Sequence, residues 1–327
     1  GGRALLRLPP APIDPEKRAA DLIELSEKLL TGHGEASGTA TARAVLDRYG
    51  ALDAGGRITF FEALARDFGA DAARLQQAMA DWQAAPGGDT GELHLASEPR
   101  RQELFRRLNR APGGTAALVA MRAALLKLIP EHPDLAVVDR DLVHLFGSWF
   151  NRGFLVLRHI DWSTPANILE KVIRYEAVHE IHDWDDLRRR IDPVDRRCYA
   201  FFHPALTDEP LIFVEVALSR DIPGAIGPIL SAERDTAHDD KFTTATFYSI
   251  SNCQRGLAGV SFGNFLIKQV VQEISRENPR LKTFVTLSPV PDFAKWLDRE
   301  RKADSPVALT PEDRAALDGL DREGWWR

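Results

Sequence analysis

The sequence predicts an α+β protein with two domains, an all-helical N-terminal domain at residues 1–146 and a mixed α/β domain at residues 147–327. Before residue 146, apolar residues recur at helical spacing, and the breaks between segments carry Gly, Pro and Asp. After it, short apolar runs rich in β-branched and aromatic residues alternate with amphipathic segments. A chain of 327 residues is long enough to bury two cores of ordinary size.

The N-terminal domain is expected to consist of consecutive helices. Asp14 followed by Pro15 is typical of an N-cap and the first helical position, and an apolar stripe that includes Leu22 and Leu29 comes next. Further helices are predicted at residues 40–49, 58–67, 71–84, 99–109 and 114–128. Because no repeat of fixed period occurs, a compact helical domain is favoured over a solenoid.

The C-terminal domain is expected to combine strands and helices. The predicted strands cover residues 154–157, 198–202, 211–218, 244–250 and 283–287. Amphipathic segments at residues 166–174 and 262–276 have helical spacing. This mixture indicates an α/β or α+β domain.

Composition excludes several classes of protein. A net charge of −6 argues against general nucleic-acid binding, although it leaves room for an anionic ligand in a local positive pocket. No apolar run reaches the ~18 residues of a membrane span. With Cys198 and Cys253 as its only cysteines, the chain has no disulfide framework, and we expect a cytoplasmic location. The first residue is Gly and the last four read GWWR, so we expect truncation at both ends.

A glycine-bearing turn lies between the strand at 244–250 and the helix at 262–276. It contains Gly256, Gly259 and Gly263. In the order strand, glycine loop, helix, unpaired N–H groups of the first helical turn point into the loop and favour a phosphate. The spacing matches neither the Walker pattern nor the dinucleotide pattern, which leaves coenzyme A among the phosphate-bearing ligands. The alternative is a tight connection without a ligand.

Two motifs resemble the malonyl-CoA decarboxylase family. They are FYSISNCQRGLAGVSFGNFLIK at 247–268 and LKTFVTLSPVPDFAKWL at 281–297. The similarity extends to GSWFNRGFLVLRHIDWSTPA at 147–166 and PLIFVEVAL at 210–218. The resemblance implies an N-terminal helical domain that mediates homo-oligomerisation and a catalytic domain similar to the GNAT acyltransferase fold. It implies the decarboxylation of malonyl-CoA to acetyl-CoA and CO₂ without a metal or redox cofactor.

The resemblance also implies which residues form the site. Backbone N–H groups of the glycine turn would bind the pyrophosphate of CoA. The matching positions are Ala258, Gly259, Val260, Ser261, Phe262, Gly263 and Asn264.

The catalytic serine of the family falls on Ser288. Independently of the resemblance, Ser288 stands where the strand at 283–287 ends and before two prolines, and ligand sites in open α/β sheets gather at such strand ends. A simple turn-forming serine is the alternative.

Two departures from the family pattern stand out. The family's proton donor is a histidine downstream of the serine motif, but the last histidine of this chain is His238. In addition, Asp292 occupies a position where the family would have glycine; it is also expected to cap the helix that follows. An acyltransferase and a non-catalytic acyl-CoA-binding sensor remain alternatives to the decarboxylase.

Other polar groups lead to further expectations. The histidines of His179-Glu180-Ile181-His182 are three residues apart rather than the four of zincins, so we expect an exposed, polar helix start. The run at 188–190, three arginines, is expected to be a solvated face. His159 and His203 are expected to be structural, although either could line a CoA cleft. Arg255 and Lys268 are the cations best placed for CoA phosphates, and Cys253 is expected to pack.

Overall fold

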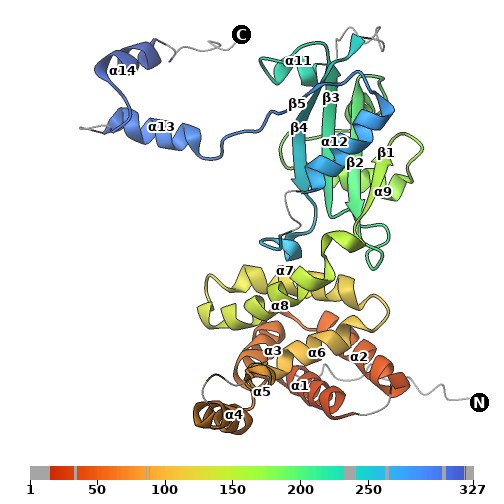
Figure 1. The fold of residues 1–327 in the computed structure, drawn as a ribbon, viewed down its shortest axis with the longest axis vertical. Helices are drawn as coiled ribbons and strands as arrows, with labels where there is room; N and C mark the ends of the chain where they lie inside the picture. The colour runs from red at the N-terminus through yellow and green to blue at the C-terminus, as the bar shows by residue number, and fades with distance from the viewer. Residues whose placement is uncertain are drawn as a thin grey trace, which may run out of the picture. The chain divides into compact units, whose positions relative to one another are not determined.

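The computed structural model describes residues 15–32, 35–85, 87, 89–231, 241–261, 265–303, 307–319 and 321. The chain forms two compact units, Gly1–Val285 and Thr286–Arg327. The first unit holds a run of helices followed by a sheet, as Figure 1 shows. The predicted class, helices followed by a mixed α/β region, is confirmed. The division at residue 146 falls inside a helix and stays a prediction.

The helical region of the first unit consists of short helices around an aromatic core. Phe60, Phe61, Phe105 and Phe146 are fully buried there. The predicted helices are confirmed with shifted ends, while α5 and α8 were not predicted. The bounds are α1 (Pro15–Thr31), α2 (Glu35–Gly50), α3 (Ala54–Arg66), α4 (Ala72–Ala84), α5 (Gly91–Ser97), α6 (Arg100–Asn109), α7 (Gly114–Leu128), the 3₁₀ turn η1 (Pro133–Leu135) and α8 (Ala136–Trp149).

Local sequence explains where several of these helices begin. The side chain of Asp53 accepts a hydrogen bond from the N–H of Gly56 at 2.8 Å, and Asp71 accepts one from Arg74 at 3.0 Å. Each aspartate therefore caps a helix start by satisfying an otherwise unpaired N–H. The Asp14 cap predicted for α1 lies outside the described residues.

The sheet has five strands in the order β1-β2-β3-β4-β5. The pairs β1–β2, β2–β3 and β3–β4 are antiparallel. The five predicted strands are confirmed, with small shifts at their ends. The bounds are β1 (Val156–Ile160), β2 (Arg196–Phe202), β3 (Ile212–Ser219), β4 (Thr244–Asn252) and β5 (Thr283–Thr286).

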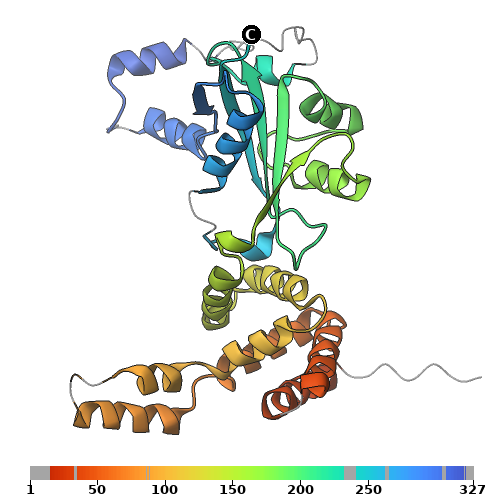
Figure 2. The ribbon, with the colours of Figure 1, turned by 45° about the vertical axis from the view of Figure 1, so that its right-hand side comes forward.

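Helices cover both faces of this sheet, as Figure 2 shows. Alternating residues of one strand belong to two separate cores, because successive side chains point to opposite faces. Phe201 packs in the core that includes Val270 of α12, whereas Phe202 packs with Ile168 of α9. The bounds of the helices and 3₁₀ turns of this region are η2 (Arg152–Phe154), α9 (Ala166–Tyr175), α10 (Trp184–Ile191), α11 (Gly227–Leu230), η4 (Arg255–Leu257) and α12 (Phe265–Glu277).

The second unit contains α13 (Phe293–Lys302) and α14 (Pro311–Asp318). Residues in α13 were predicted to be helical, and α14 was not predicted. A capping box between Thr310 and Asp313 begins α14. Arg301 bonds the carboxylates of Asp318 and Asp321, and it thereby links the two helical segments.

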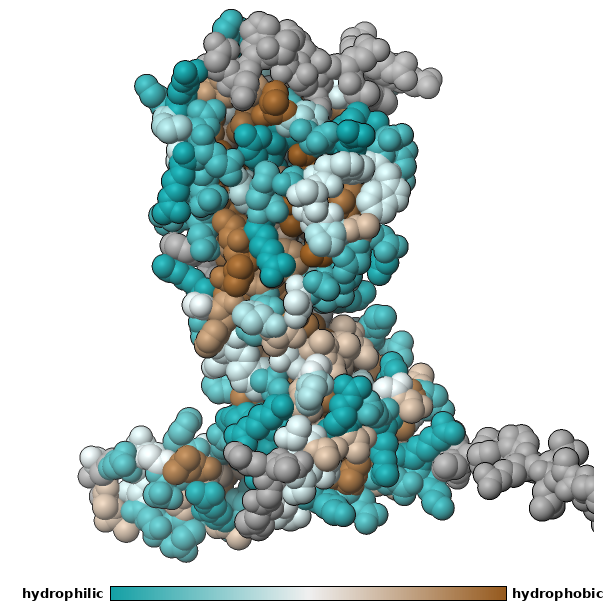
Figure 3. Space-filling model, turned by 90° about the vertical axis from the view of Figure 1, so that its right-hand side faces the viewer, coloured by the Kyte–Doolittle hydropathy of each residue, from teal (hydrophilic) through white to brown (hydrophobic). Residues whose placement is uncertain are grey.

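The surface matches the charged composition. The face drawn in Figure 3 is mostly hydrophilic, with hydrophobic side chains showing in separate patches. No helix in the described part of the chain is both long and apolar enough to cross a membrane.

Candidate functional site

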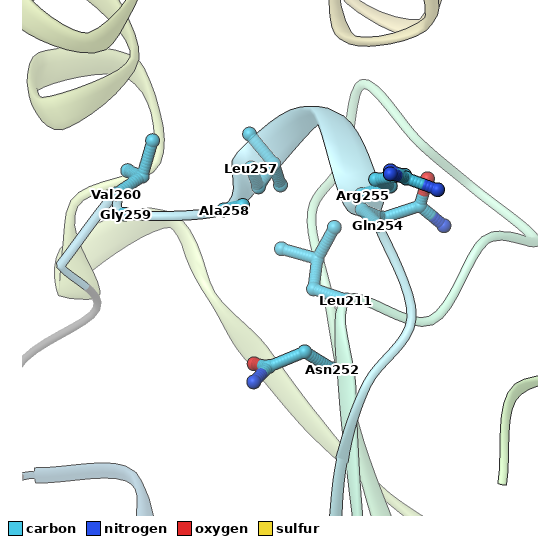
Figure 4. A pocket seen from close by; sticks show the side chains of 8 residues that line it. All are labelled: Leu211, Asn252, Gln254, Arg255, Leu257, Ala258, Gly259 and Val260. Atoms are coloured by element: carbon cyan, nitrogen blue, oxygen red, sulfur yellow. The ribbon is translucent and has the colours of Figure 1, made fainter. Parts of the chain in front are cut away.

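A pocket of about 290 Å³ lies at the glycine-bearing turn between β4 and α12. Asn252, Gln254 and Arg255 provide its polar lining, and the turn itself forms one wall, as Figure 4 shows. The other lining residues are Leu211, Leu257, Ala258, Gly259 and Val260. The pocket therefore combines exposed backbone, the amide of Asn252 and the guanidinium of Arg255, which are groups that bind an anionic ligand. The amide of Gln254 instead donates to Glu209 and to the carbonyl of Pro210.

The glycines of this turn serve different purposes. A Cβ on Gly256 would lie 1.9 Å from the carbonyl oxygen of Val119 in α7, so a neighbouring helix approaches the backbone there. Gly259 has φ +76°, a left-handed conformation that favours glycine, and a Cβ there would meet nothing within 4 Å. Space for a ligand is thus available at Gly259 but not at Gly256. Gly263 lies outside the described residues.

The backbone donors of the turn are partly used already. The N–H of Ala258 donates to the carbonyl of Arg255 at 3.1 Å, and that of Val260 donates to Leu257 at 3.0 Å. The N–H of Gly259 has no hydrogen-bond partner in the described part of the chain. Of the predicted pyrophosphate donors, Phe262, Gly263 and Asn264 lie outside the described residues. Gly259 therefore offers a ligand a backbone donor that no described residue occupies.

Two cations stand near this turn in the sequence. Arg255 is exposed at the pocket and forms no ion pair with the described residues. Lys268 is exposed in the first turns of α12, and it too forms no ion pair with the described residues. Neither side chain would therefore have to break an ion pair with a described residue in order to bind a phosphate.

Ser288 lies two residues beyond β5, and its side chain is exposed. Pro289 and an exposed Val290 follow it, and the carbonyl of Val290 accepts a hydrogen bond from the N–H of Phe293 at 3.3 Å. The turn thus holds the serine on the surface immediately before α13. Its catalytic role stays a prediction.

Asp292 adopts the left-handed conformation that glycine favours. Its φ is 59°, the only positive φ of a non-glycine residue in the described ranges. The family expectation of glycine at this position has a physical basis, because a Cβ is strained there. Asp292 is the N-cap residue of α13, as predicted, but its carboxylate forms no capping bond and instead accepts a hydrogen bond from Lys295 at 2.8 Å.

We expect Asp292→Gly to change the local stability of α13 by less than about 0.5 kcal/mol, because relief of strain offsets the higher chain entropy of glycine. Asp292→Val is expected to cost about 1–2 kcal/mol, since a β-branched residue fits this conformation poorly. Hydrogen exchange of the first amides of α13 measures both effects. Equal exchange in the two variants would contradict the assignment of strain to this position.

A buried polar cluster that was not predicted lies on the α9–α10 face of the sheet. Glu215 is fully buried, and its carboxylate lies 3.5 Å from Arg190. Arg190 also donates to the carbonyls of His179 and Glu180 and to the carboxylate of Asp186. The expectation of a solvated face at 188–190 is therefore wrong for Arg190, because its neighbours contact solvent while its own side chain turns inward.

Burial raises the pKa of Glu215 from 4.5 to about 8. A carboxyl whose pKa is higher in the folded protein stabilises it below the unfolded pKa, and this stability is lost as the pH rises through the folded pKa. Glu215→Gln removes that loss. We therefore expect the free energy of unfolding of Glu215→Gln to exceed that of the wild type by an amount that increases as the pH rises from 4.5 to about 8. Urea denaturation at both ends of this window is the measurement, and a gain that shrinks with rising pH would be the opposite result.

The His179–His182 motif does not form a metal site. No group of three or more potential metal ligands occurs among the described residues. The motif precedes α10 rather than starting it, because Asp183 is the N-cap, and Ile181 is buried. The expectation of an exposed helix start is therefore wrong in part. The segment is held in place by the buried side chain of Ile181 and by the hydrogen bonds that Arg190 donates to the carbonyls of His179 and Glu180.

The remaining predictions concern packing residues. His203 bonds the carbonyl of Trp149 through Nε2 at 3.1 Å and accepts from the N–H of Ala205 through Nδ1, as expected of a structural histidine. Burial lowers its pKa. Cys253 is buried, and burial raises its pKa, so its packing role is confirmed. His159 is exposed on β1 and lines a groove beside α12.

Comparison with known proteins supports the assignment of a family. Residues 153–327 match the model of the malonyl-CoA decarboxylase C-terminal domain, and residues 68–150 match that of the N-terminal domain. A crystal structure of malonyl-CoA decarboxylase from Rhodopseudomonas palustris is 61% identical with a TM-score of 0.87, covering 94% of this chain and 75% of that one. The protein of that name from Agrobacterium vitis is 55% identical with a TM-score of 0.87, covering 93% and 74%.

Among curated proteins, the mitochondrial malonyl-CoA decarboxylase of Anser anser anser is 39% identical over 265 residues, which is 76% of this chain and 52% of that protein. The mouse (Mus musculus) protein is 40% identical over 211 residues, 63% of this chain and 43% of its own length. The chain therefore spans about half the length of the curated relatives that it matches. With both of its regions matched, the chain belongs to the malonyl-CoA decarboxylase family.

Proposed function

We propose that the protein decarboxylates malonyl-CoA to acetyl-CoA and CO₂. The observation that carries the proposal is the match of residues 153–327 to the family's C-terminal domain. It is joined by a pocket at the glycine turn, where the N–H of Gly259 and the guanidinium of Arg255 have no partner among the described residues. The substrate is a thioester of an anionic nucleotide carrier, and these groups suit its phosphates.

The reaction needs little beyond positioning. When the C–C bond to the carboxylate breaks, its electron pair passes to the thioester carbonyl, CO₂ departs and an enolate remains. A proton then joins the α-carbon to form acetyl-CoA. Because the thioester itself accepts the electrons, we propose that neither a metal nor a redox cofactor takes part. The protein must align the carboxylate with the carbonyl π system and stabilise the enolate oxygen.

We assign these tasks to two parts of the chain. The turn at 258–264 and Arg255 bind the pyrophosphate and thereby anchor the substrate. Ser288, a short and orientable hydroxyl, orients the carboxylate or takes part in the proton relay. No base neighbours Ser288 in the sequence, so an acylated serine is not proposed.

The cellular setting follows from the same features. Two buried, free thiols suit a reducing compartment, and we propose a cytoplasmic location. The names of the curated relatives place those proteins in mitochondria. Self-association through the helical region is part of the proposal, because the family resemblance suggests it.

The test is to incubate the full-length protein with malonyl-CoA and to measure CO₂ and acetyl-CoA together. Equal amounts of both products are expected. Malonyl-pantetheine, which lacks the phosphates, is expected to react with a higher KM. Transfer of an acyl group to an amine without CO₂ would instead favour an acyltransferase, and binding of acetyl-CoA without turnover of malonyl-CoA would favour a sensor.

A further inference from the structure

A buried arginine from the helical region holds the glycine turn. Arg122 of α7 donates through Nη1 to the carbonyl oxygens of Gly256 at 2.7 Å and Ala258 at 2.8 Å. Its Nε donates to Asp139 of α8 at 2.7 Å. The side chain of Arg122 is 3% exposed. A charge buried to this extent is stable only when paired and hydrogen-bonded, so the carboxylate and the two carbonyls are parts of one arrangement.

The contact with Ala258 fixes the direction of a neighbouring donor. The carbonyl of Ala258 shares a peptide plane with the N–H of Gly259, and the described chain has no cis peptide bond. In a trans peptide these two groups point in opposite directions. A guanidinium that binds the Ala258 carbonyl on the α7 side therefore turns the Gly259 N–H to the other side. That N–H has no hydrogen-bond partner among the described residues.

Close packing adds a second restraint. At Gly256 the turn lies so near α7 that a Cβ would meet the carbonyl oxygen of Val119. The turn cannot approach or rotate at this point without moving α7. We infer that the close packing at Gly256 and the hydrogen bonds from Arg122 together fix the orientation of the peptide between Ala258 and Gly259.

We propose that Arg122, supported by Asp139, is a positioning residue for the CoA site. The helical region would then do more than mediate self-association, since it sets the orientation of a phosphate donor in the catalytic region. The positive charge on the carbonyl side also strengthens the Gly259 N–H as a donor through polarisation of the peptide. The inference rests on the proposed function, because it takes a CoA thioester as the ligand.

The chain provides a matched control. Arg101 is also buried, forms an ion pair with Asp141 of α8 and donates to the carbonyls of Leu64 and Ala65, all within the helical region. Arg101→Lys and Arg122→Lys therefore remove equivalent contacts. Both are expected to lower Tm, but only Arg122→Lys loosens the turn.

The experiment combines kinetics, binding and hydrogen exchange on the full-length protein. Arg122→Lys is expected to raise KM for malonyl-CoA and Kd for acetyl-CoA about tenfold, while kcat stays within about twofold. Its effect on malonyl-pantetheine is expected to be small, because that substrate has no pyrophosphate. The amides of residues 257–260 are expected to exchange faster in this variant than in Arg101→Lys.

Several results would overturn the inference. They are equal effects of the two lysine variants on KM and Kd, an equal penalty on malonyl-pantetheine, and unchanged exchange in the turn. A wild type that binds acetyl-CoA but releases no CO₂ contradicts the proposed reaction alone, and the binding and exchange measurements still decide the role of Arg122. A wild type that binds no CoA ester contradicts both.

Discussion

Replacing Ser288 with alanine is expected to lower kcat for CO₂ release by about 10²–10³-fold, the usual cost of losing one hydroxyl or amide positioned at the reacting centre. KM is expected to change little, since the phosphates of CoA would bind elsewhere. Because Ser288 is exposed and follows the end of β5, the substitution is not expected to alter folding. Steady-state kinetics and thermal unfolding of the same preparation measure both quantities.

Ser148, an exposed serine in α8, is the matched control. Ser148→Ala removes a hydroxyl far from Ser288 in the sequence and is expected to leave kcat unchanged. If Ser288→Ala kept the wild-type kcat, the assigned role would be wrong, and Ser288 would be a turn-forming residue only. A rise in KM without a change in kcat would instead assign it to substrate binding.

Gly256→Ala is expected to have the largest effect on stability, a loss of about 3 kcal/mol at the upper part of the range for overpacked sites. Its Cβ would lie 1.9 Å from the carbonyl oxygen of Val119 and 2.8 Å from the carbonyl carbon. The obstacle is helix backbone, so relief requires α7 and the turn to separate. That movement would also lengthen the hydrogen bonds from Arg122. A lower urea midpoint with an unchanged slope is the expected result.

Gly147 in α8 is the contrasting position, because a Cβ there would meet nothing within 4 Å. Gly147→Ala is expected to stabilise the protein by about 0.5–1 kcal/mol, the difference in helix entropy between the two residues. Opposite signs at the two glycines would confirm that packing dominates at Gly256. A Gly256→Ala variant as stable as the wild type would show that the turn does not pack against α7 in solution.

Regular structure was largely predictable because it depends on local patterns. The strand at 198–202 was found as part of β2, whose buried residues alternate between two cores. The strand predicted at 154–157 begins too early, since 152–154 form a 3₁₀ turn before β1. Helix α8 was not predicted individually, because the change of sequence pattern near residue 146 falls inside it.

The site was predictable in part. The resemblance of two motifs pointed to the family, which the comparisons then showed, and the turn after β4 does border a pocket. The unusual conformation of Asp292 agrees with the expectation of glycine there. The solvated face predicted for Arg190 is wrong, because a run of three arginines does not indicate that one of them pairs with the buried Glu215 of β3.

The sequence by itself determined the family, the order of helices and strands and the hypothesis for Ser288, since each depends on residue types and spacing within one segment. Only the tertiary structure decided the roles of the glycines in the turn after β4. Gly256 accommodates α7, whereas Gly259 has a left-handed backbone beside open space. Arg122 contacts a carbonyl 134 positions along the chain. No local sequence pattern predicts such a contact, because it forms only when distant segments pack together and a buried charge is paired and hydrogen-bonded.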